Sequence, residues 1–154
     1  MVGKSTRSLG RPQRRLKFVS LKLERVSVNI CRTQITLQRE SGRKIVCRCS
    51  GTASELGMLH SAASATAAAL GEAIEAGLDA FQIIDIEKVK VFGKAAVAVA
   101  IAVRSKRSKI NLVGFVLMDP RKPAQAGAMA VLNGTNRYIS GFLSGRVPRR
   151  REKS

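Results

Sequence analysis

Apolar and polar residues alternate through much of the first third of the chain, which is the pattern of half-buried β-strands. In the first such segment, Val26, Val28 and Ile30 share one face. Ser41-Gly42 is typical of a hairpin turn between two further alternating segments. We therefore predict three consecutive strands, over residues 24–30, 32–39 and 43–50.

The next segment, up to residue 76, is rich in alanine and contains no proline, which predicts an α-helix. Thr52-Ala53-Ser54-Glu55 fits a capping box, in which the Thr hydroxyl and the Glu carboxylate each accept a hydrogen bond from an early backbone N–H. Gly77 suits the end of the helix. The small alanine side chains would let this helix lie close to a sheet.

The order of strands and helix then repeats. We predict strands over residues 81–91, 95–104 and 109–118, and a second helix over 124–142. The segment 95–104 is apolar on both faces, so we expect it to be a central strand that is covered on both sides. Asp119 to Pro123 interrupts the last strand and caps the second helix.

These elements predict an α+β domain of two tandem βββα units, the approximate repeats 23–78 and 81–144. The expected arrangement is a sheet of about six strands with the two Ala-rich helices on one face. Glu24-Arg25-Val26-Ser27-Val28 aligns with Glu87-Lys88-Val89-Lys90-Val91. Two interpretations are open, namely an internal duplication and two generic units that share a period.

The two-unit pattern resembles the C-terminal regulatory domain of 2-isopropylmalate synthases. The resemblance covers about residues 25–138 and rests on a Gly-ended strand before each Ala-rich helix, and on Ala130-Val131-Leu132 followed by Asn136-Arg137. Ser50-Gly51-Thr52-Ala53 departs from the acidic Gly-rich turn of that family, and the sequence has no counterpart of its catalytic barrel. The resemblance implies the fold, a tendency to dimerise and a small-molecule site of the amino-acid type at a dimer interface.

Length and composition suit one domain. The chain has 154 residues, 45% of them hydrophobic and only 4% aromatic, so its core must consist of Val, Ile, Leu and Ala. We expect the domain to occupy residues 16–145, between flexible basic arms at 1–15 and 146–154. No apolar run reaches 18 residues, and no apolar segment follows the basic N-terminus, so neither a transmembrane helix nor a secretory signal is expected.

Charge changes the functional picture most. The 28 Lys and Arg outnumber the 10 Asp and Glu, which gives a net charge of +18. Residues 1–26 carry a net +7 and residues 146–154 a net +4. A field of this size favours a polyanionic partner, most often nucleic acid, bound through phosphate contacts that weaken steeply with salt.

Several clusters of basic residues are candidates for these contacts. We predict nucleic-acid contacts in the N-terminal arm, in the two basic hairpins and in the C-terminal arm, at Arg11, Arg14, Arg15, Lys17, Arg43, Lys44, Arg104, Lys106, Arg107, Lys109, Arg149, Arg150 and Arg151. Arg121 and Lys122 stand at the start of the second helix, where backbone N–H groups could receive an anion. The plainer interpretation of that segment is an Asp cap with two solvated bases.

The remaining chemistry gives little support to catalysis, and we predict no enzymatic activity, no metal and no cofactor. His60 is the only histidine. Glu72, Glu75 and Asp79 share a helical face, which is either a solvated acidic face or a docking face for a basic arm. Cys31, Cys47 and Cys49 match no zinc-site spacing and fit a reducing cytosol.

Three functions follow as hypotheses. The first is a non-enzymatic protein that binds RNA or DNA through phosphate contacts. The second, implied by the resemblance, is a regulatory domain that binds a small molecule at the interface of a homodimer. The third is an assembly protein whose basic arms join subunits or bind an acidic partner.

Overall fold

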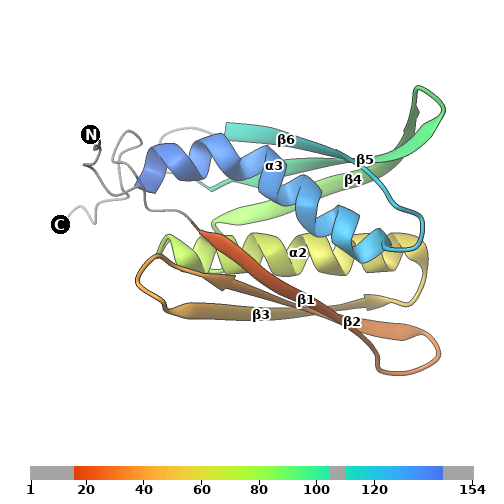
Figure 1. The fold of residues 1–154 in the computed structure, drawn as a ribbon, viewed down its shortest axis with the longest axis horizontal. Coiled ribbons are helices and arrows are strands. Elements are labelled where there is room, and N and C mark those ends of the chain that lie inside the picture. The colour runs from red at the N-terminus through yellow and green to blue at the C-terminus, as the bar shows by residue number, and fades with distance from the viewer. Residues whose placement is uncertain (1–15, 105–109, 144–154) are drawn as a thin grey trace, which may run out of the picture.

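The computed structural model describes residues 16–104 and 110–143, and within them six strands and two helices (Figure 1). The α+β class and the two βββα units are confirmed. In chain order the elements are β1 (Lys17–Arg25), β2 (Ile30–Gln38), β3 (Lys44–Thr52), α2 (Glu55–Ala73), β4 (Phe81–Val91), β5 (Lys94–Val103), β6 (Ile110–Leu117) and α3 (Pro123–Leu143). The basic segments 1–15, 105–109 and 144–154 lie outside the described residues.

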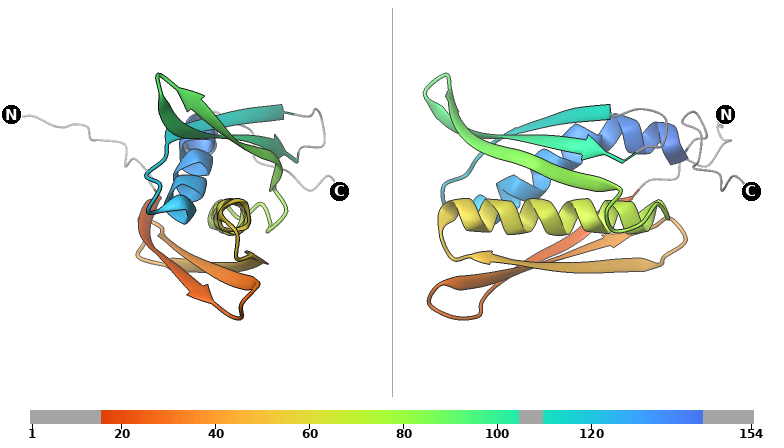
Figure 2. Two further views of the ribbon diagram at one scale, coloured as in Figure 1. Left: turned by 90° about the vertical axis from the view of Figure 1, so that its right-hand side faces the viewer. Right: turned by 180° about the vertical axis from the view of Figure 1, so that it is seen from behind.

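The six strands form two sheets instead of one continuous sheet. The orders are β1-β2-β3 and β4-β5-β6, and all four neighbouring pairs are antiparallel. The helices lie between the sheets, as Figure 2 shows end-on: α2 packs against β2, β3 and β4, α3 packs against β5 and β6, and the two helices contact each other. Alanines around the circumference of α2 are buried, so this helix can be covered from more than one side.

The central position of β5 is confirmed, but β5 is not covered on both sides. Its larger side chains, such as Val99 and Ile101, face the helices and are fully buried. Ala98, Ala100 and Ala102 point to the other side of the sheet and are only half-buried, since no described element covers that side. Small side chains on the outer face explain why the sequence looked apolar on both faces.

The first strand was predicted in the wrong place. β1 runs from Lys17 to Arg25, and most of the segment predicted as a strand connects it to β2. Val28, in that connection, is 80% exposed. A bulge between Phe18 and Ser20 interrupts the alternation of β1, so its true face is hidden in the sequence. The first unit therefore begins at Lys17, before residue 23.

The start of α2 also differs from the predicted capping box. Ser54 is the N-cap, and its hydroxyl accepts a hydrogen bond from the Gly57 N–H at 3.0 Å. Thr52 ends β3, and its hydroxyl lies 2.8 Å from that of Ser54. The helix ends at Ala73, and Gly77 adopts the left-handed conformation (φ +100) shortly after it.

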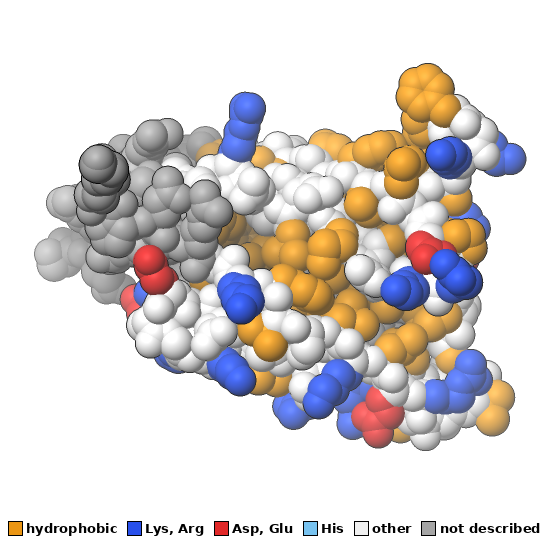
Figure 3. Space-filling view, viewed as in Figure 1, with side chains coloured by type: hydrophobic (Ala, Val, Ile, Leu, Met, Phe, Trp, Pro, Cys, Tyr) orange, Lys and Arg blue, Asp and Glu red, His pale blue; other side chains and the backbone are white. Residues whose placement is uncertain are grey.

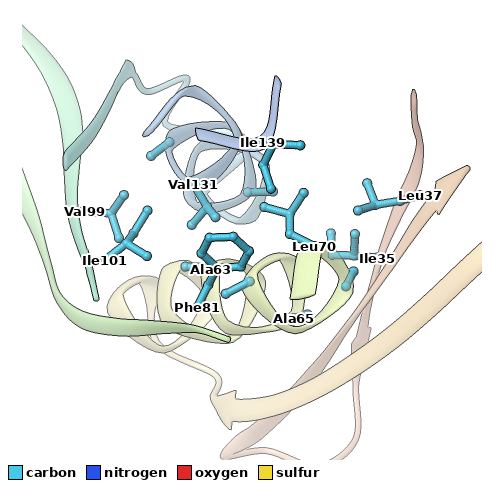
Figure 4. Packing of buried hydrophobic residues seen from close by; sticks show 14 of the residues in the cluster. Ile35, Leu37, Ala63, Ala65, Leu70, Phe81, Val99, Ile101, Val131 and Ile139 are labelled. Atoms are coloured by element: carbon cyan, nitrogen blue, oxygen red, sulfur yellow. The ribbon is translucent and has the colours of Figure 1, made fainter. Parts of the chain in front are cut away.

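One hydrophobic core joins the two units (Figure 4). Ile35 and Leu37 of the first sheet, Leu70 of α2 and Val131 of α3 belong to one buried cluster. Phe81, at the start of β4, makes an edge-to-face contact with Tyr138 of α3, with ring centroids 5.8 Å apart. No helix among the described residues is long and apolar enough to cross a membrane.

Candidate nucleic-acid interface

The side of the first sheet that faces away from the helices is polar and basic. On its inner side, Ile35, Leu37 and Ile45 are buried in the core. Because side chains alternate between the faces of a strand, the residues between them point outward. We call this side the outer face of the first sheet; it consists of Lys17, Ser20, Lys22, Glu24, Arg32, Gln34, Thr36, Gln38, Lys44, Val46, Arg48 and Ser50.

The strand register arranges these residues in rows across the sheet. Lys17, Gln38 and Lys44 form one row, and Lys22, Gln34 and Arg48 form another. Neighbouring strands lie about 4.8 Å apart, so the two bases of each row stand about 10 Å from each other across a central glutamine. The rows thus combine separated positive charges with amide hydrogen-bonding groups.

Five bases and one acid give this face a net positive charge. Glu24 is the acid, and its carboxylate lies 3.7 Å from the Arg32 guanidinium. Lys17, Lys22, Lys44 and Arg48 form no ion pair with another described residue. Their charges are therefore available to an anionic ligand.

Three predicted contact residues are brought together at one end of this face. Lys17 of β1 and Lys44 of β3 flank Gln38, and Arg43 precedes Lys44 in the β2–β3 turn. All three bases are exposed. Arg39, in the same turn, is paired with Glu75 at 3.0 Å. Lys17 and Lys44 are 27 positions apart in the sequence, so only the sheet makes them neighbours.

Arg104 belongs to the other sheet, but it lies at the same end of the molecule as the β2–β3 turn. It follows β5, and its guanidinium forms an ion pair with Asp79 just beyond α2. Arg39 and Arg104 thus both pair with acids that follow the C-terminal end of α2. The other predicted contacts fall outside the described residues: Lys106, Arg107, Lys109, Arg11, Arg14, Arg15, Arg149, Arg150 and Arg151.

Arg121 and Lys122 lie apart from these bases, at the start of α3. The Asp119 carboxylate accepts a hydrogen bond from the Arg121 backbone N–H at 3.0 Å and also contacts its guanidinium. These two hydrogen bonds lower the pKa of Asp119 below its ordinary value. The groups that Asp119 engages precede α3, which begins at Pro123, so both the plain cap and the anion site stay predictions.

Three bases of the face, Lys22, Arg32 and Arg48, are not among the predicted contact residues. Lys22 was counted only in the charge of the N-terminal segment, and Arg32 only as the start of a strand. The polar positions of β2, Gln34, Thr36 and Gln38, alternate clearly in the sequence and mark an outer face. The row partners of those positions depend on the β1 bulge and register, which the sequence does not reveal.

An open cleft lies along the free edge of the same sheet. It runs between β3 and α2, has a volume of about 630 Å³ and is lined by Arg43, Lys44, Ile45, Val46, Cys47, Arg48, Cys49, Ala68, Glu72 and Leu78. Burial raises the pKa of the Cys47 thiol, and the charge of Glu72 adds to this effect. Burial also raises the pKa of Cys49. Both thiols are therefore protonated at neutral pH.

Three acidic residues in and beside α2 form ion pairs within the molecule. Besides the pairs that Glu75 and Asp79 form, Glu55 at the start of α2 lies 2.8 Å from the Lys88 ammonium group. His60 is exposed on α2. Within residues 16–104 and 110–143, no three His, Cys, Asp or Glu side chains are grouped so that they could hold a metal ion.

Comparisons with known proteins add no assignment: no protein-family model matches the chain, and no curated protein sequence matches it.

Proposed function

We propose that the protein binds nucleic acid through phosphate contacts made by the outer face of the first sheet and by the basic residues of segments 1–15, 105–109 and 144–154. The observation that carries this proposal is the arrangement of Lys17, Lys22, Lys44 and Arg48 in rows, without acidic partners among the described residues. Bases that neutralise phosphates release condensed counterions, which supplies most of the affinity of sequence-independent binding.

The composition of the face favours backbone contacts over base recognition. None of its residues is aromatic, so the face offers no platform on which bases could stack. Its uncharged members, such as Gln34, Gln38 and Ser50, can donate hydrogen bonds to phosphate and sugar oxygens. We therefore expect binding that depends strongly on salt and weakly on sequence.

The test is fluorescence anisotropy with labelled single-stranded RNA and duplex DNA over a range of salt concentrations. The double variant Lys22→Gln, Arg48→Gln removes two phosphate contacts. The slope of log K against log salt should then become shallower by about 1.4 for RNA and about 1.8 for DNA. The full-length chain keeps all its other charges.

The matched control is the double variant Lys90→Gln, Lys94→Gln, which loses the same charge on the β4–β5 hairpin. The control should leave the slope close to that of the unchanged protein. If the slope became equally shallow in the two variants, only the net charge would matter for binding, and the outer face of the first sheet would have no special role. Absence of binding at low salt would end the proposal altogether.

We propose a second candidate function, small-molecule regulation, because the β3–α2 cleft joins opposite charges. Arg43 and Arg48 line it together with Glu72. An amino acid carries a carboxylate and an ammonium group and would find a partner for each. In thermal unfolding with a panel of amino acids, a binding ligand should raise the Tm by mass action, and the rise should vanish in Glu72→Gln. Unchanged melting across the panel would exclude this candidate without affecting the first.

A further inference from the structure

Two strand connections project at the end of the molecule opposite the β2–β3 turn (Figure 1, right). The β1–β2 tip is Val26–Asn29, and the β4–β5 tip is Phe92–Gly93. The β1–β2 tip adjoins the start of α2, and β4 passes beside that start before it reaches its tip. The Ala53 N–H donates to the Asn29 carbonyl at 2.9 Å, and Lys88 of β4 pairs with Glu55. The two tips are equivalent connections in the two βββα units.

Both tips expose large apolar side chains. Phe92 is 98% exposed and Val28 is 80% exposed, more than any other large hydrophobic residue among those described. Figure 3 shows hydrophobic side chains protruding at the upper and lower right corners, where the two hairpins end. Solvent-exposed apolar groups at a projecting tip contribute little packing to the fold, so they are available for contact with a partner.

The backbone of the β4–β5 tip makes the choice of Phe92 more unusual. Phe92 and Gly93 both have positive φ, 52° and 76°. A two-residue hairpin of this kind favours Gly at its first position, because Gly has no Cβ, or Asn and Asp, because their short polar side chains can hydrogen-bond locally. Phe92 is thus unfavourable for the turn and gains nothing from the core. Such a residue points to a role in binding.

Basic side chains stand directly behind both tips. Arg25 precedes the β1–β2 tip, and its guanidinium donates to the Val28 carbonyl at 3.3 Å. Lys90 and Lys94 flank the β4–β5 tip on its two strands. None of these three bases forms an ion pair with another residue in the described part of the chain. Each tip therefore carries an exposed apolar side chain with one or two basic side chains next to it.

We propose that these two tips dock on the surface of an anionic lipid bilayer, with Phe92 and Val28 entering the interface and Arg25, Lys90 and Lys94 contacting lipid headgroups. Apolar side chains bury into the headgroup region, and each basic residue near an anionic surface adds attraction. A plane of lipid can receive two separate convex tips at once, whereas a protein partner would need two matching pockets. Nucleic acid is less suitable, because an aliphatic side chain such as Val28 cannot stack on a base.

The chain contains no tryptophan, so Phe92→Trp creates a single fluorescent reporter at the tip. We would titrate this variant with vesicles of phosphatidylcholine alone and of phosphatidylcholine mixed with phosphatidylserine. The proposal predicts a blue shift and quenching by brominated acyl chains with the mixed vesicles. The matched reporter is Val113→Trp, at a site 71% exposed on β6 and away from both tips, and it should show neither change.

A basic chain will associate with anionic vesicles through charge alone, so a second variant separates insertion from attraction. Val28→Ser, Phe92→Ser keeps every charge and removes both apolar tips. Its vesicle affinity, measured by co-sedimentation at physiological salt, should fall about tenfold or more, as expected when a Phe and a Val side chain lose their burial. Ser replacement of Val113 should leave the affinity unchanged.

Three results would overturn the proposal. The first is a Phe92→Trp emission that does not change on vesicles that bind the protein, since the tip would then stay in water. The second is a vesicle affinity of the Val28→Ser, Phe92→Ser variant that equals that of the unchanged protein. The third is a Phe92→Trp emission that responds to RNA and not to vesicles, which would assign the tip to base stacking. The melting temperature of each variant checks that the fold is intact.

Discussion

Gly114 of β6 lies where the backbones of that strand and α3 approach each other closely. A Cβ at this position would overlap the carbonyl oxygen of Ala130, which is backbone and cannot rotate away. We expect Gly114→Ala to lower the free energy of unfolding by about 2 kcal/mol or more, because the strand and helix must separate. Urea denaturation followed by circular dichroism measures this difference.

Gly42 provides the matched glycine control. It has a positive φ of 97°, but a Cβ there would meet nothing within 4 Å. Gly42→Ala should therefore lower the stability by only about 1 kcal/mol, through backbone conformation alone. If both variants lost the same amount, the close approach of β6 and α3 would not be a determinant of stability.

The Cys47 and Cys49 thiols allow a test of the cleft by pH. Burial raises both pKa values above the ordinary value of 9.0, so less thiolate is present at pH 8 than in the unfolded chain. Alkylation by iodoacetamide, followed by peptide mass spectrometry, should be slower in the folded protein and should accelerate at higher pH. Glu72→Gln should speed the reaction of Cys47 and leave Cys49 unchanged, since only Cys47 is affected by the charge of Glu72.

The same pKa shifts determine how stability depends on pH. The folded protein retains thiol protons that the unfolded chain releases near pH 9, so stability from this source is present below pH 9 and declines as the pH rises further. Burial raises the pKa of Tyr138 as well, so its contribution to stability also declines as the pH rises above 10.

For the alkylation test, equal rates in the folded and the denatured chain would contradict the burial of both thiols.

At the scale of elements, the start of α2 distinguishes two neighbouring hydroxyls. Ser54 caps the helix by accepting from the Gly57 N–H, whereas Thr52 reaches only the Ser54 hydroxyl. Ser54→Ala should lower the free energy of unfolding by about 1 kcal/mol, the usual loss of an N-cap. Thr52→Ala should cost less. The opposite order, measured by thermal unfolding, would support the capping box that the sequence suggested.

The sequence predicted the second unit better than the first, for a physical reason. In the second unit, Gly93 and Pro120 lie just beyond strand ends, so turn residues indicate where the strands stop. In the first unit, Val26 and Val28 alternate with polar residues as in a strand, but they lie in the connection between β1 and β2. Both are exposed and do not pack in the core. Local pattern cannot distinguish an apolar side chain that packs inside from one that projects outside.

The division of the six strands into two sheets also cannot be predicted from the local pattern of apolar and polar residues. Strand periodicity gives the two faces of each strand, but it does not say which strands are neighbours. The buried alanines around α2 were the available signal, because a helix buried on several sides needs more than one layer of cover. The candidate site was also only partly predictable. The sequence identified Lys17, Arg43 and Lys44 as candidate contacts, but only the strand register places Lys22 and Arg48 on the same face as Lys17 and Lys44.

At the scale of the whole molecule, the described residues are much less basic than the chain. They contain 15 Lys and Arg against nine Asp and Glu, a net of +6 out of +18. The two outer faces also differ. That of the first sheet carries Lys17, Lys22, Lys44 and Arg48 without acidic partners among the described residues, while that of the second carries Ala98, Ala100 and Val113. Most of the net charge thus belongs to segments outside the described residues.

The outer face of the first sheet and the two tips point in different directions, so the two proposed ligands should bind at the same time. Fluorescent RNA added to protein-coated phosphatidylserine vesicles should co-sediment with them at low salt, and Lys22→Gln, Arg48→Gln should reduce the RNA recovered without reducing the protein recovered. Vesicles without protein control for trapping. If RNA instead released the protein from the vesicles in proportion to the RNA bound, both anions would share one surface, because a single cationic site cannot neutralise two polyanions at once.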